Sequence, residues 1–449
     1  MRAFTWISLI SALNLALAAP TCKAKGKTST AAAPAPTSSG TSSSGSGSGS
    51  GSTTPSNSTG GSNGTVALAW FAGYHADVFP ISNISWNKYT AMNYFVAVTA
   101  ADGSVTLESS DQTLLPQFVQ AAHSNNVKAI LTVGGWTGSQ YFSSDFATDS
   151  NRTAAAQTMM KLVQQYSLDG LDFDWEYPNA AGIGCNVQST QDPQNFLSFL
   201  QELRKQPGAD NLTLSAATGV TPWAGVTDLS GFASVLDYIE IMNYDVYGPG
   251  WSSVVGPNSP LNDTCMPSNA TQAGSAVSAV AAWSQAGFPA NQIVLGVPSY
   301  GHGWSVSVQD ATGAASASDA SALVAYPSFN KGQAAPGDKW AGAAGTDVCG
   351  NATPAGGTYE FWGLVDNGFL NGNGTVAQGK LYRYDECTQT PYVYDPTSQV
   401  MVAYDDATSF AAKGAYIKSA GLKGFALYET GGDYNDILLD AITGAVGSS

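Results

Sequence analysis

Four carboxylates lie close together between Asp169 and Glu176, and the last three of them, Asp172, Asp174 and Glu176, alternate with apolar and aromatic residues. Alternate side chains of a β-strand point to the same face, so these three would project together, each about 6.5 Å along from the last. Like charges at this spacing repel, and burying them costs free energy unless they share protons or bind a ligand. The pattern therefore predicts a strand built around an acid–base site. An acidic edge or a calcium loop fits less well, because calcium loops place Gly and Asn turns between their ligands.

The same run resembles the catalytic strand of glycoside hydrolase family 18, the chitinases and their relatives, whose signature is D-G-[LIVMF]-D-[LIVMF]-D-[WY]-E. Every position of that signature is met at residues 169–176. Residues 128–136 resemble the family's S-x-G-G-W block, with Thr132 where Ser is usual, and residues 238–245 resemble its sixth-strand motif. The resemblance covers about residues 66–442. It implies an enzyme that hydrolyses the β-1,4 bonds of chitin or chitooligosaccharides.

The expected chemistry assigns a different role to each carboxylate. Cleavage of a glycosidic bond needs an acid that protonates the leaving oxygen, and Glu176, flanked by aromatic residues, should keep its proton because desolvation and like charge raise its pKa. The resemblance implies a retaining, substrate-assisted mechanism, in which the 2-acetamido carbonyl attacks the anomeric carbon and forms an oxazolinium ion. Asp174 would accept a hydrogen bond from the acetamido N–H, and Asp172 beneath it would share a proton with Asp174. Asp169 has two interpretations, support of the strand start or a direct part in the proton network.

The other blocks imply contacts with the substrate. The Tyr244 hydroxyl would hydrogen-bond the acetamido carbonyl as a fourth catalytic group, and the Thr132 hydroxyl could reach the buried aspartates. Glycines before Trp136 allow a tight turn that presents this indole to a sugar face. The residues expected to bind substrate are Tyr74, Phe95, Gly135, Trp136, Tyr177, Met242, Asp245, Tyr300 and Tyr428.

One position departs from the family. Tyr428 stands where the aligned family segment has Trp, which forms the floor under the sugar that carries the acetamido group. Tyr can still stack, but its smaller face should weaken binding of that sugar by about 1 kcal/mol. Candidate stacking platforms for a longer chain are Trp136, Trp223, Trp304 and Trp362, each of which could instead belong to the core.

Short apolar runs that alternate with helix-like stretches predict the elements that hold these residues. We expect eight strands, at about 66–73, 91–98, 128–134, 169–177, 212–218, 238–245, 292–299 and 423–429. Such a pattern favours an α/β fold, a (β/α)8 TIM barrel whose site forms at the carboxyl ends of the strands, within a catalytic domain at 66–449. Residues 303–399 are rich in Gly, Ala and aromatics and resemble a small α+β insertion between strands 7 and 8.

The amino-terminal part predicts secretion. Residues 1–18 are typical of a signal peptide, and residues 19–65 form a linker rich in Ser, Gly, Thr and Pro that should be disordered. Nine N-glycosylation sequons point to the same route, at Asn57, Asn63, Asn83, Asn151, Asn211, Asn262, Asn269, Asn351 and Asn373. A net charge of −16 makes nucleic acid or an anionic membrane an improbable partner, whereas a neutral N-acetylglucosamine polysaccharide raises no such objection. We expect an extracellular or cell-wall monomer.

The five cysteines also fit an oxidising compartment. We expect the pairs Cys185–Cys265 and Cys349–Cys387, the second of which would staple the insertion to itself, while Cys22 is left over; other pairings stay open. The sequence has no C-x-x-C motif and no His pair at helical spacing, so we expect neither a metal nor another cofactor.

Two alternatives to a chitinase remain. An endo-β-N-acetylglucosaminidase that acts on N-glycans shares the D-x-D-x-E strand and the assisted mechanism. A non-catalytic chitin-binding lectin on the same scaffold would typically lack the acid, whereas Glu176 is present.

Overall fold

A computed structural model describes residues 64–266, 274–314, 316 and 322–447. The expected signal peptide, almost all of the expected linker, Cys22 and three of the sequons, at Asn57, Asn63 and Asn269, lie outside the described residues. No helix in the described part of the chain is long and apolar enough to cross a membrane.

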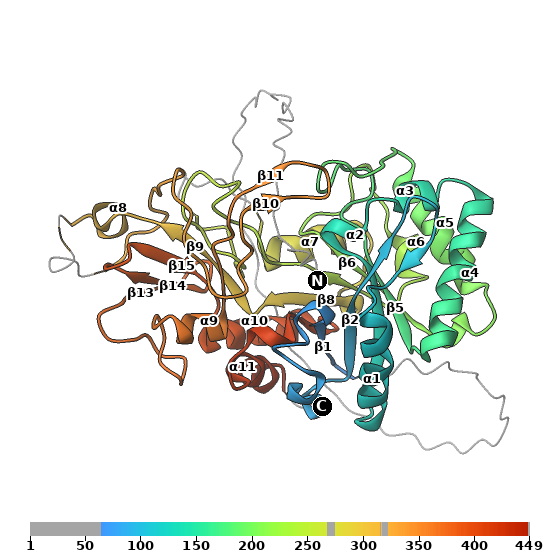
Figure 1. The fold of residues 1–449 in the computed structure, drawn as a ribbon, viewed down its shortest axis with the longest axis horizontal. Helices are drawn as coiled ribbons and strands as arrows, with labels where there is room; N and C mark the ends of the chain where they lie inside the picture. Colours follow the sequence, from blue (N-terminus) through green and yellow to red (C-terminus); the bar gives the residue numbers. More distant parts are fainter. Residues whose placement is uncertain (1–63, 267–273, 315, 317–321, 448–449) are drawn as a thin grey trace, which may run out of the picture. The chain divides into compact units, whose positions relative to one another are not determined.

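Within the described residues, eight parallel strands close into a barrel, as the sequence predicts (Figure 1). Neighbouring strands pair in the order β1-β2-β4-β5-β6-β7-β8-β16, and β16 returns to β1. The barrel strands are β1 (Val66–Ala72), β2 (Ala91–Thr99), β4 (Lys128–Gly134), β5 (Gly170–Asp174), β6 (Thr213–Thr218), β7 (Tyr238–Ile241), β8 (Ile293–Pro298) and β16 (Gly424–Tyr428). A short strand, β3 (Val105–Thr106), pairs antiparallel with the end of β2.

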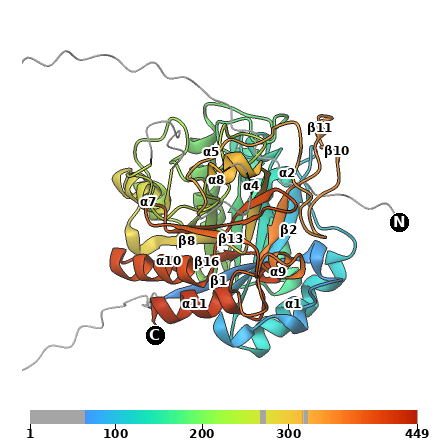
Figure 2. The same ribbon diagram turned by 90° about the vertical axis from the view of Figure 1, so that its left-hand side faces the viewer.

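Helices follow the strands, and the longer ones cover the outside of the barrel (Figure 1). They are α1 (Asp111–Ser124), α2 (Gly135–Gly138), α3 (Phe142–Asp145), α4 (Asp149–Tyr166), α5 (Asp192–Arg204), α6 (Ser230–Ala233), α7 (Ala276–Gln285), α10 (Ala407–Ala420) and α11 (Ile437–Val446). Helices α10 and α11 lie side by side in both views (Figures 1 and 2). A capping box formed by Asp406 and Ser409 begins α10, and Gly421 in the left-handed region (φ 65°) ends it.

The acidic strand β5 is oriented by its apolar residues. The ring of Phe173 packs against Phe196 and Phe199 on α5, with ring centroids 6.0 and 5.4 Å away, and Trp175 packs against Phe196 at 5.5 Å. Side chains alternate along a strand, so the outward packing of Phe173 directs its neighbours Asp172 and Asp174 into the barrel. The strand itself ends at Asp174 rather than at residue 177, so the following residues form a loop at the barrel's carboxyl end.

A second sheet is formed by the segment between β8 and β16. Within the described residues it has five antiparallel strands in the order β12-β9-β15-β14-β13, which lie beside the barrel (Figure 1). These strands are β9 (Tyr300–Ser305), β12 (Thr358–Glu360), β13 (Leu381–Asp385), β14 (Thr390–Asp395) and β15 (Val400–Ala403). The segment also contains α8 (Val308–Thr312), α9 (Phe361–Asp366) and the small hairpin of β10 (Gly345–Thr346) and β11 (Ala352–Thr353).

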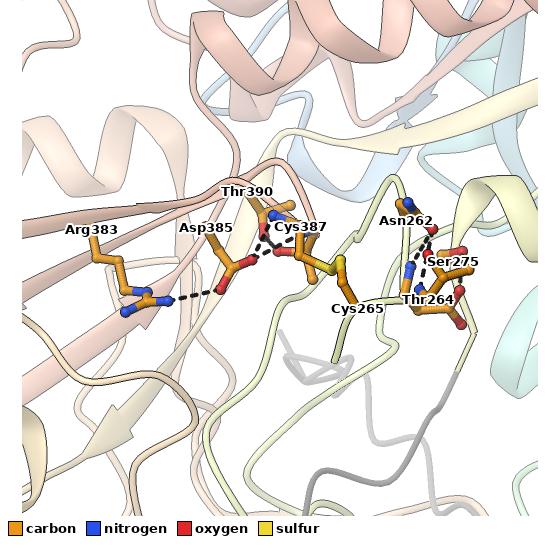
Figure 3. The surroundings of a disulfide bond; sticks show 10 residues. Asn262, Thr264, Cys265, Ser275, Arg383, Asp385, Cys387 and Thr390 are labelled. Carbon is orange, nitrogen blue, oxygen red and sulfur yellow. Dashed lines mark hydrogen bonds and ion pairs between the residues drawn. A yellow bond between two sulfur atoms is a disulfide. The ribbon is translucent and has the colours of Figure 1, made fainter. Parts of the chain in front are cut away.

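The predicted disulfide pairing is wrong. The bonds join Cys185 to Cys349 and Cys265 to Cys387, so each bridge links the segment after β8 to a barrel loop. The prediction treated that segment as a unit that closes on itself. Instead its β13–β14 turn lies against the loop after β7, where the Cys265–Cys387 bridge forms (Figure 3) and Leu261 N donates to Thr388 O at 2.8 Å.

Candidate active site

A pocket opens at the carboxyl ends of the barrel strands, and it collects residues from most of the loops. All but one of the residues predicted to act on or bind a substrate line it; the exception is Asp172, which lies beneath. The predicted lining residues are Tyr74, Phe95, Gly135, Trp136, Asp174, Glu176, Tyr177, Met242, Tyr244, Asp245, Tyr300 and Tyr428.

Asp172 is the most heavily hydrogen-bonded of the carboxylates. Its Oδ2 accepts from Trp70 Nε1 at 3.3 Å, Asn93 Nδ2 at 3.2 Å and Thr132 Oγ1 at 2.8 Å, and its Oδ1 accepts from Ser215 Oγ at 3.0 Å. The side chain is fully buried, and this burial raises its pKa, while the donated hydrogen bonds oppose that rise. The hydroxyl of Thr132 therefore makes the contact that the sequence left open.

Asp174 and Glu176 lie above Asp172 toward the pocket and are nearly buried, with 5% and 6% of their surfaces exposed. Burial, followed by the nearby Glu176 and Asp172, holds the pKa of Asp174 well above its usual value. Burial also raises the pKa of Glu176 to about 8, a hydrogen bond from Tyr177 opposes that rise and Asp245 adds to it. A pKa of about 8 lets Glu176 keep its proton at neutral pH, as a general acid requires.

Two glycines let the chain pass close to Asp172, Asp174 and Glu176, which together form the carboxyl stack. Gly134, the last residue of β4, has φ +114°, and Gly135, which follows it, has φ +80°. A Cβ atom on Gly134 would lie 2.2 Å from the backbone oxygen of Asp174, and one on Gly135 would lie 2.9 Å from the Phe95 ring. Neither position could carry a side chain, and the turn they form presents the half-buried Trp136 to the pocket.

Aromatic rings surround Tyr428 and form the floor of the pocket. The Tyr244 ring lies 5.9 Å from the Tyr428 ring at an interplanar angle of 27°, while Trp70 and Phe95 meet it edge-on at 5.8 and 5.7 Å. The hydroxyls of Tyr74 and Tyr428 are 3.0 Å apart. Tyr428 is thus held by its neighbours in one orientation, as a platform needs to be.

Polar groups face this floor from the loop after β7. Burial and then the negative charges of Asp174 and Asp245 hold the pKa of Tyr244 well above its usual value, so its hydroxyl stays protonated and can donate. Asp245 Oδ1 lies 2.6 Å from His302 Nε2, and the hydroxyl of Tyr300 also hydrogen-bonds Asp245. These contacts fix the carboxylate of Asp245 at the edge of the pocket.

Other residues that the sequence raised lie elsewhere. Asp169 is at the opposite end of β5, where its Oδ2 accepts from Ala129 N at 2.8 Å and lies 2.8 Å from His123 Nε2, so it supports the strand start. Two of the proposed stacking platforms are wrong: Trp223 packs in the core against Phe232 and Trp283, and Trp304 is fully buried. Trp362 is partly exposed, its ring lies 5.0 Å from the ring of Trp340, and it does not line the pocket.

Sequence reasoning missed several residues around the stack. Trp70, Asn93 and Ser215 all donate to Asp172, and Glu240 lies beside it. Each lies two positions from another inward-facing residue of its own strand, as Glu240 does from Tyr238. The alternation that placed Asp172 beneath Asp174 could therefore have found them.

The arrangement suits a reaction that needs a proton donor and a nearby negative charge. Glu176 can donate a proton, Asp174 can accept a hydrogen bond from a substrate N–H, and the Tyr244 hydroxyl can donate to a substrate oxygen. The aromatic floor would hold an apolar sugar face between them.

Comparisons with known proteins agree on one family. The sequence model of the glycosyl hydrolases family 18 matches residues 68–433. A chitinase-like effector of Moniliophthora roreri is 49% identical over 400 residues, which cover 88% of this chain and 95% of that protein. Chitinase A1 of Niallia circulans is 33% identical over 325 residues, 70% of this chain and 42% of that protein. Among solved structures, a chitinase from Rhizomucor miehei is 30% identical with a TM-score of 0.74, and the match covers 85% of this chain and 99% of that one.

Proposed function

Because this chain belongs to glycoside hydrolase family 18, we propose that it hydrolyses the β-1,4 bonds of chitin or chitooligosaccharides with retention of configuration. The observation that carries the proposal is that Asp174 and Glu176 line one pocket with the aromatic floor, and that burial raises the pKa of Glu176 to about 8. In this proposal the neighbouring carboxylate, Asp174, binds the acetamido N–H and does not attack the anomeric carbon, so the sugar's own acetamido oxygen is the nucleophile of a substrate-assisted route.

Each residue has a step to perform. An N-acetylglucosamine unit on Tyr428 places its acetamido group between Asp174 and Tyr244, with the N–H toward the carboxylate and the carbonyl oxygen accepting from the hydroxyl. Glu176 gives its proton to the glycosidic oxygen as that bond breaks and the acetamido oxygen bonds to the anomeric carbon. The negative charge shared by Asp174 and Asp172 stabilises the cationic oxazolinium. Water then attacks the anomeric carbon while Glu176 takes a proton from it. The bond between the anomeric carbon and the acetamido oxygen breaks, which opens the ring, and the acid is restored.

The proposed substrate follows from the pocket and from the relatives. Those relatives include proteins named as chitinases, and the floor offers rings rather than charges to a neutral sugar. The expected signal peptide and sequons support action outside the cell, on chitin in the medium or in a cell wall.

Hydrolysis of a defined N-acetylglucosamine tetramer tests the proposal. The wild type and Glu176→Gln would be compared, and the product anomer would be read by NMR immediately after cleavage. We expect β-anomer from the wild type and a loss of at least about 100-fold in the variant, as removal of a general acid produces. An initial α-anomer product, or an undiminished rate in Glu176→Gln, would refute the assigned mechanism.

A second candidate is a chitin-binding protein that does not cleave its ligand. One observation favours it: a relative that is 49% identical over 400 residues is named a chitinase-like effector. Under this alternative the wild type binds the tetramer, for example by calorimetry, with an affinity that Tyr428→Ala weakens, and no product forms at any pH. Product formation that depends on Glu176 excludes it.

A further inference from the structure

Glu240 is a buried acid in the barrel to which the proposed reaction gives no role. It lies on β7, where it pairs in register with Ala217 of β6 and Val294 of β8, and none of its surface is exposed. It has the same inward orientation as Tyr238, two residues earlier, so its carboxyl enters the barrel interior below the pocket.

This interior has more hydrogen-bond acceptors than donors. Ser215 and Asn93 lie against both Glu240 and Asp172, and they donate to Asp172 at 3.0 and 3.2 Å. Glu240 lies within hydrogen-bonding reach of Asp172, Ser215 and Asn93. Because Ser215 and Asn93 donate to Asp172, neither oxygen of Glu240 receives a hydrogen within the described residues, and Asn93 Oδ1 receives none either. A buried acceptor without a donor destabilises the folded protein, so this group of acceptors needs one more hydrogen.

Charge leads to the same requirement. The titratable groups that face Glu240 are Asp172 from β5 and Tyr238 from its own strand; Ser215 and Asn93, from β6 and β2, do not ionise. Among the described residues no cation is found with them. Two fully buried carboxyls that touch the same two side chains cannot both be ionised, because no cation offsets their mutual repulsion and only Asp172 accepts hydrogen bonds that would stabilise a charge.

We propose that Glu240 carries a proton and donates it to Asp172, so that Asp172 can hold a negative charge beneath Asp174. A proton on Glu240 removes the surplus of acceptors and forms a charge-assisted hydrogen bond, which is stronger than a neutral one. Asp172 would then have five donors, the fifth from an acid rather than from an amide, indole or hydroxyl. Glu240 is a positioning residue in this scheme, because it acts on the substrate only through Asp172 and Asp174. Its catalytic meaning rests on the proposed hydrolase function.

Two substitutions of Glu240 distinguish its role as a hydrogen-bond donor from its ability to ionise. Glu240→Gln keeps the shape and retains an N–H that can donate to Asp172, but it cannot hold a titratable proton. Glu240→Leu has a similar volume and offers no donor, so the ionised form of Asp172 is less stable and its pKa rises.

The first measurement is an infrared difference spectrum of wild type against Glu240→Gln at pH 7. We expect the wild type to show the C=O stretch of one additional protonated carboxylic acid, and the variant to replace it with an amide band. Loss of an ionised carboxylate band instead would overturn the proposal, because Glu240 would then be charged. This experiment needs no substrate, so it stands whether or not the chain proves to be an enzyme.

The second measurement is the pH dependence of kcat/KM. We expect the kcat/KM of Glu240→Gln to stay within about threefold of wild type and to fall at the same acidic pH. In Glu240→Leu this fall at acidic pH should move up by about one pH unit, because the proton affinity of Asp172 rises about tenfold. A uniform loss in Glu240→Leu, with the fall at an unchanged pH, would show a packing role only and would overturn the proposal. If neither form of the protein cleaves the tetramer, the hydrolase function has failed, and the infrared result still decides where the proton lies.

Discussion

Replacing Glu176 by Gln should stabilise the protein at neutral pH while it removes the catalytic acid. Burial raises the pKa of Glu176 from 4.5 to about 8 in the folded state. When a carboxyl has a higher pKa in the folded than in the unfolded state, the stability linked to its proton is complete below the unfolded-state pKa and is lost as pH rises toward the folded-state pKa. Gln cannot ionise, so the variant has no such loss.

The size of the effect follows from the pKa values. Each pH unit between them costs the wild type about 1.4 kcal/mol relative to the variant, so the difference should be close to zero at pH 4.5 and on the order of 3 kcal/mol at pH 7. The side chain is 6% exposed, so solvent screens little of this difference.

Urea unfolding of both proteins at pH 4.5, 6 and 7 measures this difference, and Glu386→Gln, at an exposed glutamate, is the matched control. We expect the stability of Glu176→Gln over wild type to grow with pH, while the control stays within about 0.5 kcal/mol of wild type at every pH. A difference that does not change with pH would refute the reasoning, because Glu176 would then titrate alike in the folded and unfolded states.

Three further changes have defined outcomes. Tyr428→Trp enlarges the pocket floor and should lower KM about fivefold, the equivalent of about 1 kcal/mol of stacking; an unchanged or raised KM would contradict this. Thr132→Val removes one of the donors to Asp172 and should lower the free energy of unfolding by about 2 kcal/mol, whereas Thr132→Ser should retain it. Joint replacement of Cys185 and Cys349 by Ser should make the β10–β11 hairpin the first site of limited proteolysis, while the same change at the other disulfide should leave that hairpin intact.

The barrel could be predicted because its strands have a local signal. Short apolar runs between polar stretches predicted all eight strands of the described barrel, with ends that differ by at most four residues. The largest difference is at β7, which ends at Ile241 rather than at residue 245, because the chain turns there and Asp245 takes a positive φ of 56°. Chain turns of this kind depend on neighbours such as Asn258, whose Oδ1 accepts from Asp245 N at 2.8 Å, and the sequence does not reveal them.

The disulfides and the indoles could not be predicted in the same way. Cys349 and Cys185 are 164 residues apart. Cys349 lies in the turn of the β10–β11 hairpin and Cys185 in the loop after β5, and the folded paths of these two segments bring the cysteines together. The sequence does not distinguish a Trp that lies in a groove from one that lies in the core. Trp223 and Trp304 are buried because neighbouring elements cover them. Both errors come from contacts between elements, which no local pattern encodes.

The site could be predicted in part. Alternation along one strand predicts where its acids lie, but it does not predict which of them are protonated. Alternation along β5 places Asp172 below Asp174, but the charge on that pair depends on Trp70, Asn93 and Ser215, which come from three other strands. Each of these residues, taken alone, is ordinary barrel filling. Closure of the barrel brings the donors of these residues to the carboxylate of Asp172. In our proposal the same carboxylate is the acceptor for the proton of Glu240. The chemistry of the acidic strand is therefore set by the barrel as a whole, and a test of Glu240 is a test of that dependence.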